Sequence, residues 1–458
     1  MAELKRALGL WPAVSIVVGT VIGSGIFLVP KAMINAVGSP RMVFFIWVFG
    51  GLLSLAGALT YAELASAIPE AGGEYAYLRE AYGPMWAFIY GWTQMWVAKS
   101  GSIATLATGF FYYLANFYPN LEGKFFVIPL PIGANGGPLD VSYGQILAMA
   151  VILLLALVNY FGVRFGGNVQ VAVTAVKIVL IAGVVVIGLL APQGTFQNLS
   201  TSTAAIGGIS GFFAALVAAL WAYDGWNNVA MISSEIRNPR KDLPRALILG
   251  TASVILVYLF ANLAYFYVLS SGEVGATDRV AAAMMRKVMG APGAGIVSLA
   301  AMISIFAALN GSILTGARVP YAMARDGLFF RSIGVVHPRW FTPSNSILAL
   351  SFWSALLVLS GRYDQLFTYV IFSSWILYGM AAASVVVLRR KRPDLDRPYR
   401  TWGYPFVPVL FVLAAAALLA STLRTSPRES LMGICIILAG LPFYARWKKR
   451  LSRIIATA

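Results

Sequence analysis

The sequence is poor in the charged residues that keep soluble proteins in water. Only 11% of its 458 residues are Asp, Glu, Lys or Arg, whereas a soluble domain carries about 25%. A chain of this length with so little charge cannot cover a water-facing surface of its own size. The scarcity excludes a soluble enzyme and a disordered protein, and it shifts attention to the apolar residues, which make up 59% of the chain.

Two residue types that build many functional sites occur once each. Cys435 is the one cysteine, so an intrachain disulfide and a disulfide-stapled secreted scaffold are excluded. His337 is the one histidine, which excludes a metal site made of clustered histidines. The sequence also lacks a Walker loop, a G-x-S-x-G elbow and a pair of catalytic carboxylates. It therefore predicts no metal, no other cofactor and no enzymatic activity.

Long apolar runs are what the sequence has instead. The mean hydropathy is +0.77, and runs of roughly 20 apolar residues, the length of a bilayer-spanning helix, recur along the chain. They predict an all-α polytopic membrane protein, with residues 1–458 forming a single transmembrane domain. Twelve membrane-spanning helices are expected near residues 10–36, 41–68, 84–117, 142–162, 169–191, 206–235, 244–270, 293–325, 344–360, 364–389, 404–423 and 429–446.

The net charge of +17 is distributed unevenly over the loops between these spans. Alternate loops and the termini place 23 Lys and Arg residues on one side and 9 on the other, while Lys99 and Lys177 fall inside spans. Basic loops remain in the cytoplasm, so both termini are expected there and the chain in the plasma (inner) membrane. The charge thus reflects topology, and the lipid bilayer rather than nucleic acid is the expected surrounding.

A short basic segment at 279–290 is too short to span a membrane and is predicted to be an amphipathic helix on the outer side. It is interpreted either as a helix at the lipid interface or as part of an extracellular gate.

Two predicted spans contain residues that weaken a helix in mid-membrane. Residues 19–27 hold three glycines, each less favourable than alanine in a helix by about 1 kcal/mol, although close helix packing also explains the spacing of Gly19 and Gly23. Residues 221–228 place Asp224 and Gly225 at a similar depth. An acidic residue is expensive in hydrocarbon unless it lines a polar cavity. Both segments are therefore predicted to be helix breaks.

The two predicted breaks are five spans apart, each in the first helix of one half of the chain. Interruptions at corresponding positions are typical of transporters built from inverted repeats. Freed N–H groups at a half-helix N-terminus favour a carboxylate, and freed carbonyls favour an ammonium group. We therefore expect a zwitterionic substrate, with its α-carboxylate at residues 23–26 (Gly23, Ser24, Gly25 and Ile26) and its amine at the carbonyls around Trp221 and Ala222, beside Asp224 and Gly225.

The ordered set of motifs resembles the amino acid–polyamine–organocation (APC) superfamily, and within it the L-amino-acid-transporter (LAT) branch with its bacterial permeases and exchangers. The residues that carry the resemblance are 23–27 (GSGIF) with Pro30, 61–64 (YAEL), 69–75 (PEAGGEY), 221–227 (WAYDGWN), 235–239 (EIRNP) and 389–398. The resemblance implies a LeuT-type 5+5 inverted repeat with broken helices 1 and 6. Residues 1–191 would form the first repeat, 206–392 the second, and 404–450 two peripheral helices. It also implies sodium-independent exchange or facilitated uptake of L-amino acids by alternating access.

Lys177 lies well inside the fifth predicted span. It is interpreted either as a lysine that snorkels to the interface or as a fixed ammonium group between helices. The resemblance implies the second role, in place of a sodium ion. We then expect Lys177 to tie helix 5 to the carbonyls of helix 1 and to helix 8 near Asn310, Ser312 and Thr315.

Lys99 and Asp224 are two further charges at mid-membrane depth. They either pair across a shared cavity or are satisfied separately by water and backbone. The LAT branch carries a small residue at the position of Asp224, so this chain departs from the branch there. A neutral amino acid would fit a Lys99–Asp224 pair, an unpaired Lys99 would favour an acidic side chain, and an unpaired Asp224 a cationic one.

Four more residues receive roles from the resemblance or from their position. Trp221 is either a packing residue or an aromatic gate over the substrate. Ser374, with Ile22 and Ile26, would form a pocket for small to medium neutral side chains, although a serine in a helix also bonds back to its own backbone. Glu63 and Glu235 near the cytoplasmic ends of spans 2 and 6, close in sequence to Arg237, Arg240 and Lys241, are either a gating network or plain ion pairs.

Secondary transport of amino acids is thus the favoured function. A proton-coupled symporter, with Asp224, Glu63 or Glu235 carrying the proton, is the alternative, as is a carrier of charged amino acids or polyamines. A membrane enzyme and a substrate sensor are disfavoured, because neither catalytic motifs nor a soluble signalling domain is found. No obligatory accessory subunit is expected, since residues 118–141 lack the cysteine that light-subunit relatives use there.

Overall fold

The computed structural model describes residues 3–129, 139–359, 363–425 and 427–457. Helices dominate these residues because apolar side chains recur around whole helical turns and a helix satisfies its backbone hydrogen bonds internally, as a bilayer requires. The α-helices are α1 (Leu10–Val21), α2 (Gly25–Val37), α3 (Pro40–Ala67), α4 (Glu74–Tyr82), α5 (Pro84–Thr93), α6 (Lys99–Leu114), α7 (Tyr143–Tyr160), α8 (Val163–Leu189), α9 (Gly208–Tyr223), α10 (Asn228–Met231), α11 (Pro239–Val268), α12 (Ser271–Ala276), α13 (Val280–Met289), α14 (Ala291–Gly316), α15 (Arg318–Arg325), α16 (Ser344–Val358), α17 (Tyr363–Lys391), α18 (Phe406–Thr425) and α19 (Pro427–Thr457).

Short irregular helices and one hairpin complete the chain. A π-helical turn, η1 (Gln94–Ala98), joins α5 to α6. Among the described residues, four 3₁₀ turns lie in loops or at helix ends: η2 (Pro119–Glu122), η4 (Phe196–Ser200), η5 (Ser233–Glu235) and η6 (Arg331–Gly334). The strands β1 (Lys124–Ile128) and β2 (Leu139–Ser142) pair antiparallel between α6 and α7. Hydropathy gave no sign of this hairpin, because it lies in a loop and its apolar side chains Phe125, Phe126 and Val127 are exposed.

The prediction of an all-α polytopic membrane protein is confirmed. Within the described residues, eight helices are long and apolar enough to cross a membrane, and α1 with α2 forms a ninth such element, bent by 41°. The helices α9 and α16 are apolar but shorter, and the predicted third span is divided into α5, η1 and α6. Each of the twelve predicted segments contains helix, while the number of crossings stays a prediction.

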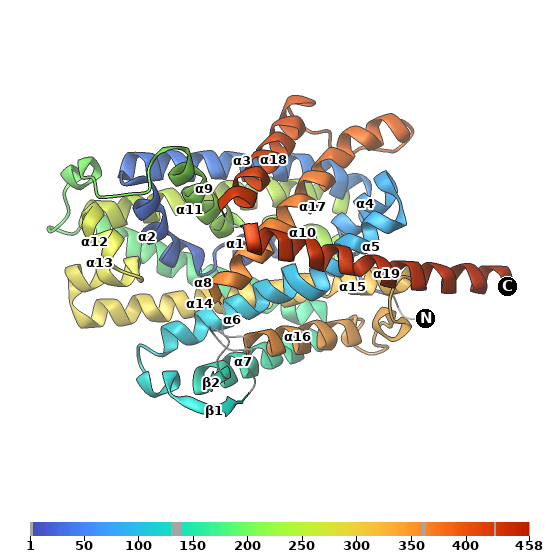
Figure 1. Ribbon diagram of the computed structural model, residues 1–458, viewed down its shortest axis with the longest axis horizontal. Helices are drawn as coiled ribbons and strands as arrows, with labels where there is room; N and C mark the ends of the chain where they lie inside the picture. Colours follow the sequence, from blue (N-terminus) through green and yellow to red (C-terminus); the bar gives the residue numbers. More distant parts are fainter. Residues whose placement is uncertain (1–2, 130–138, 360–362, 426, 458) are drawn as a thin grey trace.

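The two chain termini lie at the same end of the molecule, to the right in Figure 1, whereas α12 and α13 lie at the opposite end. We call the first end the terminal side and the second the distal side. In the middle of the bundle, α1 packs against α8, α11 and α14, and α9 packs against α2 and α3. The two interrupted helices are therefore surrounded by protein, where irregular backbone is tolerated at membrane depth.

The predicted amphipathic segment forms α13 on the distal side. Val280, Ala281, Met284 and Met285 are buried, and the helix packs against α14, α2, α11 and α8. Arg279 at its start donates a hydrogen bond to the Tyr112 carbonyl at 3.1 Å and covers the Tyr112 ring. The segment thus packs on the protein rather than lying on lipid alone. Its role as a gate stays a prediction.

Candidate functional site

The first helix break is narrower than predicted. The helix α1 ends at Val21 and α2 begins at Gly25, so only residues 22–24 are non-helical. Within the described part of the chain, the N–H groups of Ser24, Gly25 and Ile26 have no backbone acceptor, and the buried hydroxyl of Ser24 has no hydrogen-bond partner. The N-terminus of α2 therefore presents several donors without partners, which is the arrangement that binds an anion at a helix N-terminus.

The second break separates α9 from α10. Residues 224–227 form turns after Tyr223, and Gly225 has a φ of +103°, a conformation that favours glycine because it has no Cβ. The Thr20 hydroxyl of α1 lies 3.0 Å from the carbonyl oxygen of Gly225 and 2.7 Å from that of Ile16 in its own helix, and its one proton is shared between them. This polar contact crosses directly from one interrupted helix to the other.

The two breaks lie face to face. A Cβ atom added to Gly25 would lie only 2.7 Å from Cα of Ala222, so the close approach of α2 and α9 requires glycine there. The Tyr258 hydroxyl of α11 lies 2.9 Å from the carbonyl oxygen of Val21 and 2.7 Å from that of Ala222, and its proton is shared between them. Tyr258 joins both breaks, yet no motif distinguishes it in the apolar sequence of its helix.

A cavity of about 20 Å³ lies between the breaks, enough for about one water molecule. Of the predicted substrate residues, those that line it are Gly23, Ser24, Gly25, Trp221, Ala222 and Asp224. The other predicted members are not among its lining residues: Ile22 and Ile26 are wholly buried, Ser374 is buried on α17, and Gly225 contacts Thr20. The two breaks therefore enclose a cavity that is too small to hold an amino acid.

A larger hollow of about 600 Å³ adjoins this cavity and reaches Asp278 on the distal side. Gly25 and Trp221 line both spaces. Trp221 is only 8% exposed, and because it lines both spaces it lies at the boundary between the open hollow and the closed cavity. That position agrees with the predicted gate, although packing alone would also bury the ring.

Lys177 is held between three helices. Its ammonium group donates hydrogen bonds to the carbonyl oxygens of Gly19 at 2.8 Å, Ile22 at 2.5 Å and Ser304 at 3.3 Å. The side chain is wholly buried, so the snorkelling interpretation is wrong. The contact with helix 1 agrees with the expectation, whereas the contact with helix 8 (α14) occurs at Ser304.

Two of the residues expected near Lys177 on α14, Asn310 and Thr315, bond elsewhere. Asn310 donates to Gln170 Oε1 of α8 at 2.9 Å and accepts from Asn159 of α7 at 2.9 Å, and Thr315 donates to its own helix at Gly311. These positions lie two to three turns along α14 from Ser304, since a helix rises 1.5 Å per residue. Polar residues recur along α14, and the sequence alone does not show which helical turn lies opposite Lys177.

A family model for amino acid permeases matches residues 8–441. The chain belongs to this family. It is 36% identical over 456 residues to the serine/threonine exchanger SteT of Bacillus subtilis (strain 168), covering 98% of each chain. It is 33% identical to the b(0,+)-type amino acid transporter 1 of Mus musculus, over 98% of this chain and 91% of that one. The Asc-type amino acid transporter 1 of Mus musculus is 32% identical, over 96% and 81%. The resemblance to LAT-like transporters is thereby confirmed, and the family is one of transporters.

Lys99 and Asp224 do not form an ion pair in the described structure. Lys99 Nζ donates to Asn228 Oδ1 at 2.6 Å, and Asp224 Oδ1 accepts from the Tyr378 hydroxyl at 3.0 Å. Separate satisfaction, the second of the two alternatives, is therefore the arrangement found, with neutral protein groups as the partners. Only Asp224 lines the small cavity.

Glu74 is a buried carboxylate that sequence reasoning gave no role. It begins α4, which links α3 to α5, and its Oε1 accepts a hydrogen bond from Asn227 in the second break. The Tyr90 hydroxyl donates to its other oxygen at 3.0 Å. Burial raises the pKa of Glu74 to about 7, against hydrogen bonds from Asn227 and Tyr90 that favour the charged form. The sequence feature that could have indicated it is the position of this acidic residue directly after Gly72 and Gly73, between two apolar spans.

Two glutamates close the terminal side through arginines that are distant in sequence. Glu235 and Arg318 are both wholly buried and form a bidentate pair at 2.7 and 3.0 Å. Glu63 accepts from Arg389 at 2.7 and 2.9 Å and from the Thr401 N–H at 2.7 Å. The expected partners near residue 240 are wrong, because Arg240 instead pairs with Asp396 in the open. Whether either pair acts as a gate stays a prediction.

Proposed function

We propose that this protein exchanges small to medium neutral L-amino acids across the plasma membrane by sodium-independent alternating access. The observation that carries the proposal is the direct contact of two helix breaks around a cavity, with unpaired N–H donors on one and an acidic residue on the other. Paired interruptions of this kind belong to inverted-repeat transporters. The first repeat would comprise residues 1–191 and the second residues 206–392.

In this proposal the substrate α-carboxylate binds the N–H groups of Ser24, Gly25 and Ile26 and the Ser24 hydroxyl. Those groups are buried without partners in the described chain, so a bound carboxylate would satisfy them. The amine would lie at the α9 C-terminus, where the Trp221 and Ala222 carbonyls already accept one hydrogen bond each, from Asp224 N–H and Tyr258. A carbonyl has a second lone pair, and the Asp224 carboxylate adjoins.

Alternating access would follow from what the substrate does to this contact. The structure is hollow from the distal side down to Trp221 and closed by ion pairs on the terminal side. Binding between α2 and α9 would draw Trp221 over the substrate, and opening of the Glu235–Arg318 and Glu63–Arg389 pairs would release it. The fixed ammonium of Lys177 holds the first break without any need for sodium. The basic loops favour a cytoplasmic terminal side.

Counterflow in proteoliposomes tests the proposal with the purified chain alone, which also tests the absence of an accessory subunit. Labelled serine or threonine is chosen because the relative SteT is named a serine/threonine exchanger. Uptake should require unlabelled amino acid inside and should be unchanged when choline replaces sodium. Uptake that ignores internal substrate would contradict exchange, and dependence on sodium would contradict the role given to Lys177. Competition by a panel of amino acids then defines the side chain carried.

Proton-coupled symport is the second candidate, and one observation favours it. Glu74 has a pKa of about 7 and accepts a hydrogen bond from Asn227 within the second break. Protonation of Glu74 would therefore act on the second break through this hydrogen bond. An imposed pH gradient distinguishes the two functions. Symport predicts uptake driven by the gradient into vesicles without internal amino acid, and exchange predicts none.

A further inference from the structure

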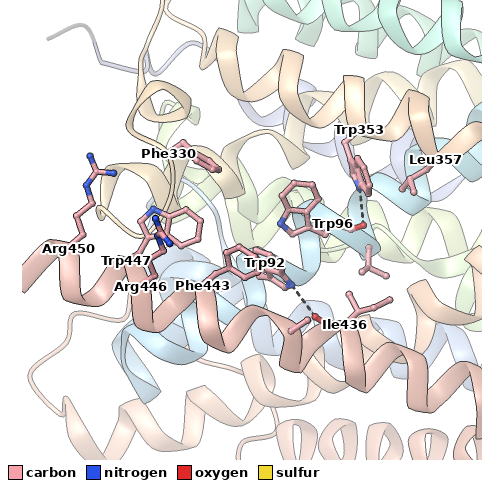
Figure 2. A pocket seen from close by; sticks show the side chains of 12 residues that line it. Trp92, Trp96, Phe330, Trp353, Leu357, Ile436, Phe443, Arg446, Trp447 and Arg450 are labelled. Carbon is pink, nitrogen blue, oxygen red and sulfur yellow. Dashed lines mark hydrogen bonds between the residues drawn. The ribbon is translucent and has the colours of Figure 1, made fainter.

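A second hollow lies away from the two helix breaks, in the terminal half of the bundle. An apolar groove of about 990 Å³ separates α19 from the α5–η1 segment and α16. Figure 2 shows Trp92, Trp96 and Trp353 along one wall and Phe443 and Trp447 of α19 along the other. The groove is therefore walled by large rings from helices that are far apart in the sequence.

The aromatic side chains form a series along the groove. Nearest the terminal side, the Phe330 and Trp447 ring centroids lie 5.4 Å apart. Phe443 stacks on Trp92 at 4.7 Å, and farther along, Trp96 meets Trp353 at 5.1 Å. Ile436 lines the groove beside Trp92, and Arg446 follows it ten residues later. Ten residues correspond to about 15 Å of helix. That is half of the roughly 30 Å hydrocarbon core, the depth of one leaflet.

The interior of the groove offers little to a polar ligand. The indole N–H of Trp92 donates to the Ile436 carbonyl at 3.1 Å, and that of Trp353 donates to the Trp96 carbonyl at 3.0 Å, as the dashed lines in Figure 2 show. These two donors are already used within the protein. The indole N–H of Trp96 is buried without a partner in the described chain. The rest of the lining is ring surface and aliphatic side chains such as Leu357 and Ala439, which favour a hydrocarbon chain.

The terminal end of the groove carries positive charge. Arg446 and Arg450 are one helical turn apart on α19 and both line the groove. Their side chains are exposed, and neither forms an ion pair with a described acidic residue. Figure 2 shows both guanidinium groups at the end of the groove beside Trp447. Arginine is well suited to phosphate, because its planar fork binds two oxygens at once.

We propose that this groove binds an anionic phospholipid of the terminal-side leaflet. One acyl chain lies along the rings from Trp447 to Trp353, and the phosphate contacts Arg446 and Arg450. Apolar walls of one-leaflet depth, with two arginines that form no ion pair with a described acidic residue, match that lipid in both length and charge. The bound lipid would fill the space between α19 and the helices that lead to the π-helical turn η1.

Native mass spectrometry of the full chain from nanodiscs tests this site. The discs contain phosphatidylcholine with one-fifth phosphatidylglycerol, and the wild type should retain one phosphatidylglycerol per chain. R446Q/R450Q should weaken retention at least tenfold. A439W, which fills the groove and keeps the charge, should weaken it as well. The matched control R428Q/K449Q removes two charges from the same helix at residues that do not line the groove, and should retain the lipid.

Several results would overturn the proposal. Equal retention of phosphatidylcholine would remove the role of the arginines, and equal loss in R428Q/K449Q would reduce the effect to surface charge. If every variant kept its phosphatidylglycerol and the chain formed dimers, a second chain would be the occupant of the groove. Circular dichroism and size-exclusion profiles identical to those of the wild type confirm that each variant is folded, so that lost retention reports on binding.

Discussion

The ammonium group of Lys177 lies 2.5 Å from the carbonyl oxygen of Ile22, the first non-helical residue of the first break. The Ser304 hydroxyl donates to the same oxygen at 2.8 Å. A carbonyl freed by unwinding is thus bound by a charged donor from α8 and a neutral donor from α14. The broken backbone of helix 1 is held by side chains of neighbouring helices, and this is how non-helical backbone persists at membrane depth.

Replacement of Lys177 by methionine, which has a similar length and no charge, should lower the exchange rate at least tenfold. The variant leaves the Gly19, Ile22 and Ser304 carbonyls without their shared donor, so the first break is no longer tied to α8 and α14. Initial rates of counterflow measure the effect. Lys124→Met, at an exposed pair with Asp140, is the control and should transport normally. A Lys177→Met variant with wild-type rates would contradict the role of the ammonium group.

Gly25→Ala should abolish transport. The new Cβ would lie 2.7 Å from Ala222 Cα and 2.8 Å from its Cβ, so α2 and α9 would have to separate and the two breaks could no longer share one cavity. Gly50→Ala is the matched control, because its nearest neighbour would be an ordinary 3.6 Å away. Counterflow with both variants checks the prediction. If Gly25→Ala exchanged substrate as fast as Gly50→Ala, the close contact would not be needed for function.

Arg318→Met should destabilise the protein by about 3–5 kcal/mol, because it leaves Glu235 buried without its partner. The double variant Glu235→Leu/Arg318→Met should recover part of this loss, since both charges are then absent. Arg240→Met, at an exposed pair with Asp396, should change stability by about 1 kcal/mol or less. Unfolding curves in detergent give the three values, and a double variant no better than Arg318→Met would argue against the pair as the source of the loss.

Asp224→Asn should change substrate selectivity more than expression. Asp224 lines the small cavity, and its side-chain hydrogen bond in the described structure comes from the neutral Tyr378 hydroxyl, so loss of its charge should lower uptake of cationic relative to neutral amino acids. Lys99→Gln should have the smaller effect, because Lys99 bonds to Asn228 and does not line the cavity. Competition profiles of both variants measure this. Unchanged transport kinetics in both variants would show that neither charge contributes to substrate selectivity.

Glu74→Gln should abolish a pH dependence of stability. Since the pKa of Glu74 is about 7 in the folded protein against an ordinary 4.5, the folded state favours the protonated carboxyl. Its contribution is complete below about pH 4.5 and is lost as the pH rises through 7, a change of about 3 kcal/mol. Unfolding measured from pH 4.5 to 8 should show a slope in the wild type that is missing in the variant. If the stability of the wild type and of the variant changed with pH in parallel, a group other than Glu74 would be responsible for the pH dependence.

Hydropathy and glycine placement predicted the helical class, both helix breaks and the depth of Lys177, because each depends on how one segment meets the bilayer. The partners of the charged residues were harder. Arg237, Arg240 and Lys241 are close to Glu235 along the chain, yet Arg318 of α15 binds it. Glu74 and Tyr258 showed no role until folding placed one beside Asn227 and the other between the two breaks.

The order of apolar runs, basic loops and interrupted segments determined by itself that this chain is a polytopic membrane protein with paired breaks. A bilayer acts on each segment separately, and it requires length, apolarity and internal hydrogen bonding that can be seen locally in the amino-acid order. Only the tertiary structure decided that Lys99 binds Asn228 and that Lys177 binds α14 at Ser304. Such contacts depend on the rotation and axial offset of packed helices, and a shift of a single turn, about 5.4 Å, exchanges one partner for another.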